Sequence, residues 1–350
     1  MESACHHPRR SCVRILIITP EQPRTTGNWV SAQRQQKGLQ ALGHDVHILE
    51  AGESVQQLQG VIEESAPDVV NVMHAFRSGK QWLACRQAGR IPMAVTLTGT
   101  DVNHGLADLE QGPTILTVLT QAQAVITINA LTTMALQRSY PDLALRLHHV
   151  APAFDPGNEP YSLRQNLDTP QDCVLFLHPA SIRPVKANLE LLEMFEPVVS
   201  AGPSCRLVFC GPMLDIDYGR HFLKAIKHRP WARYAGEIQV SAMPAAMRDA
   251  DIIINNSISE GFSNTLYEAA CLGTPILAKD IPGNVVAFAS GRQGLLYDTP
   301  QRFVEQAMTM ARDPELRHKL SQPQHTPRSP QEEARQLEKI FLALVAQTRR

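Results

Sequence analysis

The stretch Val13-Arg14-Ile15-Leu16-Ile17-Ile18-Thr19 decides the fold class of this chain. It is short, rich in β-branched residues and almost continuously apolar, as a strand covered on both faces of a parallel sheet must be. A polar loop with Gly27 follows, then a stretch of helical character that ends at Gly43, and a second strand is expected over residues 44–49. The sequence therefore opens with a β-α-β unit.

Strand-like apolar runs alternate with helical stretches along the rest of the chain. The further strands are expected over residues 68–74, 93–98, 124–128, 173–178, 206–211, 251–255 and 275–278. Such alternation is typical of parallel sheets with helices on both faces. Prolines and a glycine between residues 151 and 170 interrupt it, and the interruption predicts a linker between two similar α/β halves.

We expect four segments along the chain. Residues 1–12 form a disordered tail, residues 13–155 a first domain, residues 156–325 a second domain, and residues 326–350 end the chain with a helix. Apolar side chains recur along that helix at intervals of three and four residues, so one of its faces must be covered. Two α/β halves also create a cleft at the carboxyl ends of their strands, where ligands bind in open α/β folds.

Composition excludes several classes of protein. The chain has 350 residues, of which 43% are hydrophobic and 19% charged, and a formal net charge of -1. These values are unlike those of a disordered, collagen-like or nucleic-acid-binding chain. The apolar runs fall short of the roughly 20 residues that span a bilayer, and the first twelve residues lack an apolar signal region. We expect a cytoplasmic protein without a transmembrane segment, whose seven cysteines are reduced thiols.

The most informative stretch lies at residues 257–275. An expected strand ends before it, and a helix is expected over residues 264–272, so the free N–H groups at its start point into the cleft and attract phosphate. Glu260 in the loop and Glu268 in the helix are eight positions apart, and their carboxylates suit the hydroxyls of a sugar and a ribose. Alternatively, Glu260 caps the helix and Glu268 lies on a solvated face.

With its continuation Gly273-Thr274-Pro275-Ile276-Leu277-Ala278, this stretch resembles the donor-binding signature of retaining GT-B glycosyltransferases of family 4. Residues 181–186 resemble the basic loop of that family, and residues 236–238 its base-binding region. The resemblance covers residues 170–300 well and the first half loosely. It implies a GT-B fold, in which two Rossmann-like, doubly wound parallel-sheet domains face a cleft, and a final helix that packs back on the first domain.

By this resemblance, Arg183 and Lys186 clamp the donor diphosphate, Glu260 touches the donor sugar and Glu268 holds the ribose hydroxyls. A dianionic leaving group needs compensating positive charge, which an Arg and a Lys on one loop supply without a metal ion. The alternative for both basic residues is an ordinary surface turn. The remaining donor-binding residues implied are Gly261, Phe262, Ser263, Asn264, Glu237 and Ile238.

The first half supplies the expected loops for the acceptor and for closure of the cleft. Their candidate residues are Gly27, Asn28, His74, Arg77, Thr100 and Asp101. Many relatives carry a histidine near residues 98–101, where this chain has none, and Thr100 or Asp101 is expected to substitute for it. His74 follows a strand and suits hydrogen bonding to substrate, although a lone histidine at a strand end is often structural.

Two metal-like patterns are set aside. Asp215-Ile216-Asp217 has the form of a DxD motif but lies outside the fold that uses it, so we interpret it as a solvated turn. Cys5, His6, His7 and Cys12 lie in the expected disordered tail.

The sequence thus predicts a metal-independent, retaining hexosyltransferase that uses a UDP-linked sugar as co-substrate and needs no other cofactor. Its acceptor is a small molecule or a glycan, no nucleic acid is expected as a partner, and the oligomeric state stays open. Residues 73–78, 97–101 and 281–284 resemble the glycosyltransferase 1 domain-containing proteins and the selenosugar synthases. Three alternatives remain: a synthase that joins UDP-N-acetylglucosamine to selenophosphate, a non-catalytic nucleotide-sugar binder, and a sugar-nucleotide epimerase.

Overall fold

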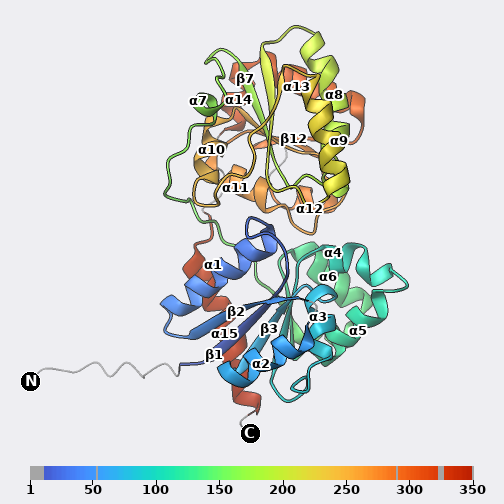
Figure 1. Ribbon diagram of the computed structural model, residues 1–350, viewed down its shortest axis with the longest axis vertical. Helices are drawn as coiled ribbons and strands as arrows, with labels where there is room; N and C mark the ends of the chain where they lie inside the picture. The colour runs from blue at the N-terminus through green and yellow to red at the C-terminus, as the bar shows by residue number, and fades with distance from the viewer. Residues whose placement is uncertain (1–11, 53, 289–290, 322–326, 349–350) are drawn as a thin grey trace, which may run out of the picture.

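The structure, a computed structural model, describes residues 12–52, 54–288, 291–321 and 327–348. Figure 1 shows two lobes, each built on one sheet. Every strand pair in both sheets is parallel. The two doubly wound parallel-sheet domains expected from the alternating pattern are therefore confirmed. Residues 1–11 of the expected tail, with Cys5, His6 and His7, lie outside the described residues.

The first lobe holds a six-stranded sheet in the order β2-β1-β3-β4-β5-β6. Its strands are β1 (Arg14–Pro20), β2 (Asp45–Ala51), β3 (Val69–Met73), β4 (Met93–Leu97), β5 (Ala124–Thr127) and β6 (Leu147–His149). Its helices are α1 (Gly27–Ala41), α2 (Val55–Ser65), α3 (Arg77–Leu83), α4 (Thr100–Asn103), α5 (Gly112–Gln121) and α6 (Ala130–Ser139), with 3₁₀ turns η1 (Gly105–Ala107) and η2 (Pro141–Arg146).

The packing of strand β1 explains why its sequence is almost wholly apolar. Ile15 and Ile17 pack into the hydrophobic cluster under α1, whereas Leu16 and Ile18 pack into the cluster on the opposite face of the sheet. Both faces of the sheet are covered, so the residues of β1 that point to either face are buried, and Arg14 at its start is the exposed one.

The second lobe holds a six-stranded sheet in the order β12-β11-β10-β7-β8-β9. Its strands are β7 (Val174–Pro179), β8 (Cys205–Cys210), β9 (Ala232–Tyr234), β10 (Ile252–Asn255), β11 (Ile276–Lys279) and β12 (Gly294–Tyr297). Its helices are α7 (Leu163–Asn166), α8 (Asn188–Ser200), α9 (Ile216–Lys227), α10 (Met243–Asp249), α11 (Asn264–Leu272), α12 (Pro282–Val285), α13 (Pro300–Arg312) and α14 (Pro314–Leu320), with the 3₁₀ turn η3 (Pro184–Lys186).

The strand orders fix where a ligand would bind. The order reverses between β1 and β3 in the first sheet and between β7 and β10 in the second. At such a switch point the loops leave the sheet toward opposite faces and open a crevice at the carboxyl ends of the strands. The loops after these four strands are therefore the ones that face a ligand.

The last helix, α15 (Pro330–Thr348), lies beside α1 in the first lobe (Figure 1). A Cβ atom placed on Gly38 of α1 would lie 2.8 Å from the Cβ of Ala334, so the two helices are in close contact. Arg34 forms a buried ion pair with Glu333 at 2.6 Å, and Glu333 also accepts a hydrogen bond from the backbone N–H of Ala153. The chain thus returns from the second lobe to cover the first sheet. In the part of the chain that the structure describes, no helix is long and apolar enough to cross a membrane.

Candidate active site

A cavity of about 250 Å³ lies between the two lobes, at the switch points of both sheets. Eleven of the residues predicted from the sequence line it: Gly27, Asn28, Arg77, Thr100, Arg183, Lys186, Glu260, Gly261, Phe262, Ser263 and Asn264. Five do not line it: His74, Asp101, Glu237, Ile238 and Glu268. The sequence therefore identified the loops of this cavity better than the direction of each side chain.

Lys186 and Glu260 form a largely buried ion pair in this cavity, with side chains that are 15% and 14% exposed. The Oε1 atom of Glu260 also accepts hydrogen bonds from Ser257 Oγ at 2.7 Å and from Asn255 Nδ2 at 3.3 Å. Burial works against the charge of Glu260, but Lys186 and these hydrogen bonds outweigh it and lower the pKa of the carboxyl. All these bonds reach Oε1, so Oε2 has no partner among the described residues and is available to a ligand.

This pairing differs from the expectation that Lys186 clamps a diphosphate. The ammonium charge is held by Glu260, so Lys186 fixes the carboxylate rather than presenting a free cation. The two residues lie 74 positions apart, on the loops after β7 and β10.

Arg183 is the cation of the second lobe that lines the cavity without a carboxylate partner among the described residues. It precedes the turn η3, and its guanidinium is partly buried, which lowers its pKa, while the charge of Glu260 acts in the opposite direction. A guanidinium nevertheless stays protonated in proteins. Its Nε is buried and has no hydrogen-bond partner among the residues that the structure describes. This donor suits an anionic oxygen.

Two helix N-termini meet beside this guanidinium. Helix α1 begins at Gly27 and helix α11 at Asn264, and a Cβ atom placed on Gly27 would lie 3.7 Å from Asn264 Nδ2. Neither helix carries an acidic residue in its first turn. Thr26, which precedes α1, makes no capping hydrogen bond with its side chain. At α11, Ser263 Oγ accepts a hydrogen bond from the N–H of Leu266 at 3.4 Å. The N–H groups before Leu266, and those at the start of α1, are left with positive partial charge for an anion.

The loop with Glu260 is held against the first lobe by residues that the sequence analysis did not select. Asn103 donates to the carbonyl oxygen of Glu260 at 2.6 Å, and Asn129 donates to that of Gly261 at 3.0 Å. His104 hydrogen-bonds Ser259 at 2.7 Å. These residues follow β4 and β5, and their position after strands of the first sheet was the available signal.

His74 lies behind the cavity wall and holds Thr100. Its ring is 4% exposed, its Nδ1 accepts a hydrogen bond from the backbone N–H of Arg77 at 3.1 Å, and its Nε2 lies 3.0 Å from Thr100 Oγ1. Because Nδ1 accepts, Nε2 carries the proton and donates to the threonine. Its backbone has a φ of 73°, uncommon for a residue with a side chain.

Asp101 differs from the expectation that it reaches the ligand. It is fully buried, and its carboxylate accepts hydrogen bonds from the backbone N–H groups of Ala75, Thr98 and Gly99. These bonds shape the loop after β4, so Asp101 positions Thr100 instead of contacting a substrate.

The two residues of the expected base-binding region point in different directions. Ile238 is buried in the core of the second lobe. Glu237 is exposed and accepts a hydrogen bond from Thr25 Oγ1 of the first lobe at 2.8 Å. This bond links the two lobes at the edge of the cleft.

Glu268 lies on α11 near Arg34 and Asp155, outside the lining of the cavity. Burial raises its pKa to about 7; the charge of Arg34 opposes this shift and that of Asp155 adds to it. Glu268 is therefore a carboxyl that changes charge near neutral pH, at the junction of α1 and α11.

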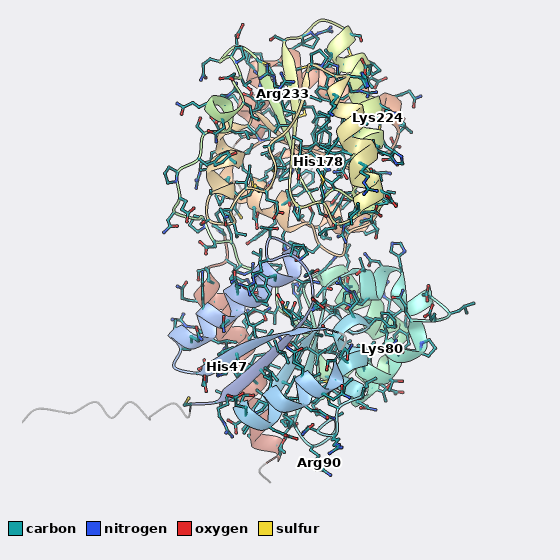
Figure 2. All side chains as sticks on the ribbon, viewed as in Figure 1. His47, Lys80, Arg90, His178, Lys224 and Arg233 are labelled. Atoms are coloured by element: carbon teal, nitrogen blue, oxygen red, sulfur yellow. The ribbon has the colours of Figure 1, made fainter. Side chains whose placement is uncertain are left out.

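His178, at the end of β7 and labelled in Figure 2, is buried in the second lobe. Burial, with a smaller contribution from the charge of Lys186, lowers the pKa of His178 to about 4. This ring is therefore neutral at pH 7 and adds no charge to the site. Asp215, in the DxD pattern, accepts a hydrogen bond from the N–H of Tyr218 and caps α9.

Comparison with known proteins finds a family model that matches the second lobe. The model of the family Glycosyl transferases group 1 matches residues 162–324. Glycosyltransferase 1 domain-containing protein 1 of Xenopus tropicalis is 26% identical over 316 residues, which cover 84% of this chain and 87% of that protein. D-inositol 3-phosphate glycosyltransferase of Corynebacterium glutamicum is 26% identical over 179 residues, 48% of this chain and 43% of that protein.

Solved structures share the fold. HepE of Anabaena, in complex with UDP and glucose, has a TM-score of 0.70 at 15% identity and covers 96% of this chain and 99% of its own. Sucrose-phosphate synthase of Thermosynechococcus elongatus has a TM-score of 0.73 at 15% identity, covering 96% of this chain and 97% of its own. The predicted GT-B fold is confirmed. Residues 162–324 match the model of the glycosyltransferase group 1 domain, and this match, with the glycosyltransferase relatives, supports a transferase.

Proposed function

We propose that this enzyme transfers a hexosyl group from a UDP-linked sugar to an acceptor, with retention at the anomeric carbon and without a metal ion. One observation carries the proposal: the free guanidinium of Arg183 lies in one cavity with the N-termini of α1 and α11. Cationic side chains and helix N-termini are the groups that bind a diphosphate.

The charges of the cavity support this ligand. Six charged residues line it: Arg34, Arg77, Arg183, Lys186, Glu260 and Glu333. Lys186 is paired with Glu260 and Arg34 with Glu333, so each carboxylate is neutralised by one cation. Arg77 and Arg183 remain without a carboxylate partner among the described residues. The cavity therefore carries unbalanced positive charge that an anionic donor would neutralise.

The donor sugar is proposed to lie against Glu260. The free Oε2 of this carboxylate is suited to accept hydrogen bonds from sugar hydroxyls, while Lys186 holds the opposite oxygen. Gly261, Phe262, Ser263 and Asn264 present the start of α11 to the diphosphate. We propose that Glu268 accepts from the ribose hydroxyls and that residues 236–238 lie near the base. A UDP-linked donor is favoured because HepE, which shares the fold, holds UDP and glucose.

The reaction proposed needs positioning and charge more than a side-chain base. The bond between the anomeric carbon and the diphosphate oxygen breaks, and the electron pair leaves with the diphosphate toward Arg183. The acceptor hydroxyl enters from the same face, and its proton passes to the departing phosphate oxygen. Stabilisation of the developing negative charge by donors already in place is the largest contribution such a site makes.

Calorimetric titration with a UDP-sugar tests this proposal. Arg183→Gln should weaken binding by roughly tenfold to a hundredfold, because a hydrogen bond to a charged group contributes about 1.5–3 kcal/mol. Arg220→Gln is the matched control, since Arg220 is exposed on α9 and its one ion-pair partner among the described residues is Asp217. If the wild type and Arg183→Gln bind the UDP-sugar with equal affinity, Arg183 does not bind the donor and the proposed function is contradicted.

A cytoplasmic location is proposed with this function. Cys173, Cys205 and Cys210 are free and buried in the second lobe, and burial raises the pKa of Cys205 and of Cys210 to about 12. Thiols of this kind suit a reducing compartment.

A further inference from the structure

The cavity wall formed by the first lobe presents hydrogen-bond donors. Arg77, at the start of α3, lines it without a carboxylate partner among the described residues, whereas Arg34 is paired with Glu333. Its guanidinium donates to the carbonyl oxygen of Glu21 at 3.1 Å and, more weakly, to Gln22 Oε1 at 3.5 Å. A guanidinium has five N–H donors, so Arg77 keeps several for a ligand.

Gln22 extends this wall. Its Oε1 faces Arg77, and this contact turns the amide nitrogen away from the guanidinium. The Nε2 atom is buried and has no hydrogen-bond partner in the described part of the chain, although the residue lines the cavity. A buried donor without a partner is costly, and a ligand oxygen would satisfy it.

Thr100 adds a third donor, and His74 sets its direction. The neutral ring donates its Nε2 proton to Thr100 Oγ1, so the lone pair on that side of the hydroxyl is occupied. The hydroxyl proton of Thr100 is then free for a ligand in the cavity, toward which this residue is exposed. Burial lowers the pKa of His74, although the charge of Asp101 opposes this, and the ring stays neutral at pH 7.

No free carboxylate competes for these donors among the described residues that line the cavity. Glu260 is held by Lys186, and Glu333 by Arg34. Glu21 does not line the cavity, and its Oε2 lies 3.3 Å from the Cβ position of Gly52. A wall with one cation that has no carboxylate partner and with several neutral donors is suited to a group with several anionic oxygens.

We propose that Arg77, Gln22 and Thr100 bind a phosphate group on the acceptor, so that the acceptor is a phosphorylated hydroxyl compound. This inference rests on the proposed function, in which Arg183 and the N-termini of α1 and α11 bind the donor diphosphate. The bound phosphate orients the acceptor, and a separate hydroxyl of the acceptor attacks the anomeric carbon.

The competing arrangement is a single diphosphate held by both guanidiniums. Burial lowers the pKa of Arg77, and the charge of Arg183 lowers it to a smaller extent. The two guanidiniums are therefore near each other. Two separate anions are favoured because Arg77 is joined to neutral donors of the first lobe. Gln22 faces its guanidinium, and His74 accepts from its backbone N–H while holding Thr100. Arg183 lies on the loop after β7 of the second lobe.

Titration of the UDP-loaded protein with inorganic phosphate, at constant ionic strength, separates the two arrangements. We expect saturable phosphate binding with UDP still bound. Arg77→Gln should weaken phosphate binding by tenfold or more and change UDP affinity by less than about twofold. Arg183→Gln should instead weaken the binding of UDP. Thr100→Val should also weaken phosphate binding, which supplies a second variant should Arg77→Gln fail to fold.

Arg90→Gln is the matched control, because Arg90 is exposed and lies away from the cavity in Figure 2. The inference is overturned if phosphate displaces UDP or if no saturable phosphate binding occurs. It is also overturned if Arg77→Gln weakens the binding of UDP as strongly as Arg183→Gln does. Loss of UDP binding by the wild type, or UDP binding that is independent of Arg183, would instead overturn the proposed function itself.

Discussion

Gly99 and Gly261 touch backbone to backbone across the cleft. A Cβ atom placed on Gly261 would lie 2.1 Å from Gly99 Cα and 2.9 Å from the carbonyl oxygen of Thr98. Gly99 has a φ of +119°, which residues with side chains rarely adopt. The loop that carries Glu260 therefore lies directly against the first lobe, with no side chain between them.

Gly261→Ala should lower the rate of transfer without unfolding the protein. The added methyl group meets backbone, which must shift and take Glu260 away from its place in the cavity. A displacement near 1 Å in a site of this kind costs roughly a hundredfold in rate. UDP release from a UDP-sugar, with a metabolite extract as the source of acceptor, measures the effect.

Gly60→Ala is the control for this substitution. Gly60 lies within α2, and nothing is within 4 Å of its Cβ position. We expect a gain of about 0.5–1 kcal/mol in the free energy of unfolding and no change in UDP release. Full activity in Gly261→Ala would show that the contact with Gly99 does not position the site.

Lys186→Met should destabilise the protein more at pH 8 than at pH 5. Removal of one partner from a buried ion pair costs about 3–5 kcal/mol, because the other charge stays buried alone. In the wild type the pKa of Glu260 is lowered, so its contribution to stability is present above the carboxyl's unfolded pKa and is lost as the pH falls. Without Lys186, burial raises the pKa of Glu260, and protonation at pH 5 relieves the cost.

Urea denaturation of the single and double variants measures this difference. Lys186→Met/Glu260→Gln should recover most of the loss at pH 8, since no charge remains buried. An equal loss at pH 5 and pH 8 for Lys186→Met would mean that Glu260 is not the group left unpaired.

The fold was predictable because both faces of each sheet are covered. That burial makes β1 and β7 almost wholly apolar, and such runs are easily recognised in the sequence. The order of the strands was not predictable from these runs, because one buried parallel strand resembles another. The reversals at β1 and at β7 depend on which face each connecting helix takes.

The site was predictable as a set of loops and less so as a set of contacts. Arg183 and Glu260 follow strands, and carboxyl ends of parallel strands meet at one edge of a sheet. Whether a side chain in such a loop enters the cleft depends on local backbone angles. Asp101 therefore binds its own loop, and Ile238 enters the core. The pairing of Lys186 with Glu260 needs the three-dimensional structure, because separate loops carry them.

Chelation of divalent metal ions should leave UDP release unchanged. In the proposed site, Arg183 and two helix N-termini meet the charge of the donor diphosphate without a metal ion. We expect equal rates in EDTA and in magnesium chloride at matched ionic strength. A rate that EDTA abolishes and Mg²⁺ restores would contradict the assignment of this role to Arg183.

Glu268→Gln should stabilise the protein at pH 8 and have little effect at pH 5. Burial raises the pKa of Glu268 to about 7 from an ordinary value of 4.5, with Asp155 adding to the shift and Arg34 opposing it. The folded chain thus binds this proton more tightly than the unfolded chain. Its contribution to stability is complete below about pH 4.5 and is lost as the pH rises through 7.

Urea denaturation between pH 5 and pH 8 should show a gap between the variant and the wild type that widens with pH. Glu305→Gln, at an exposed position on α13, is the control and should give parallel profiles. Parallel profiles for Glu268→Gln as well would show that Glu268 is charged throughout this range.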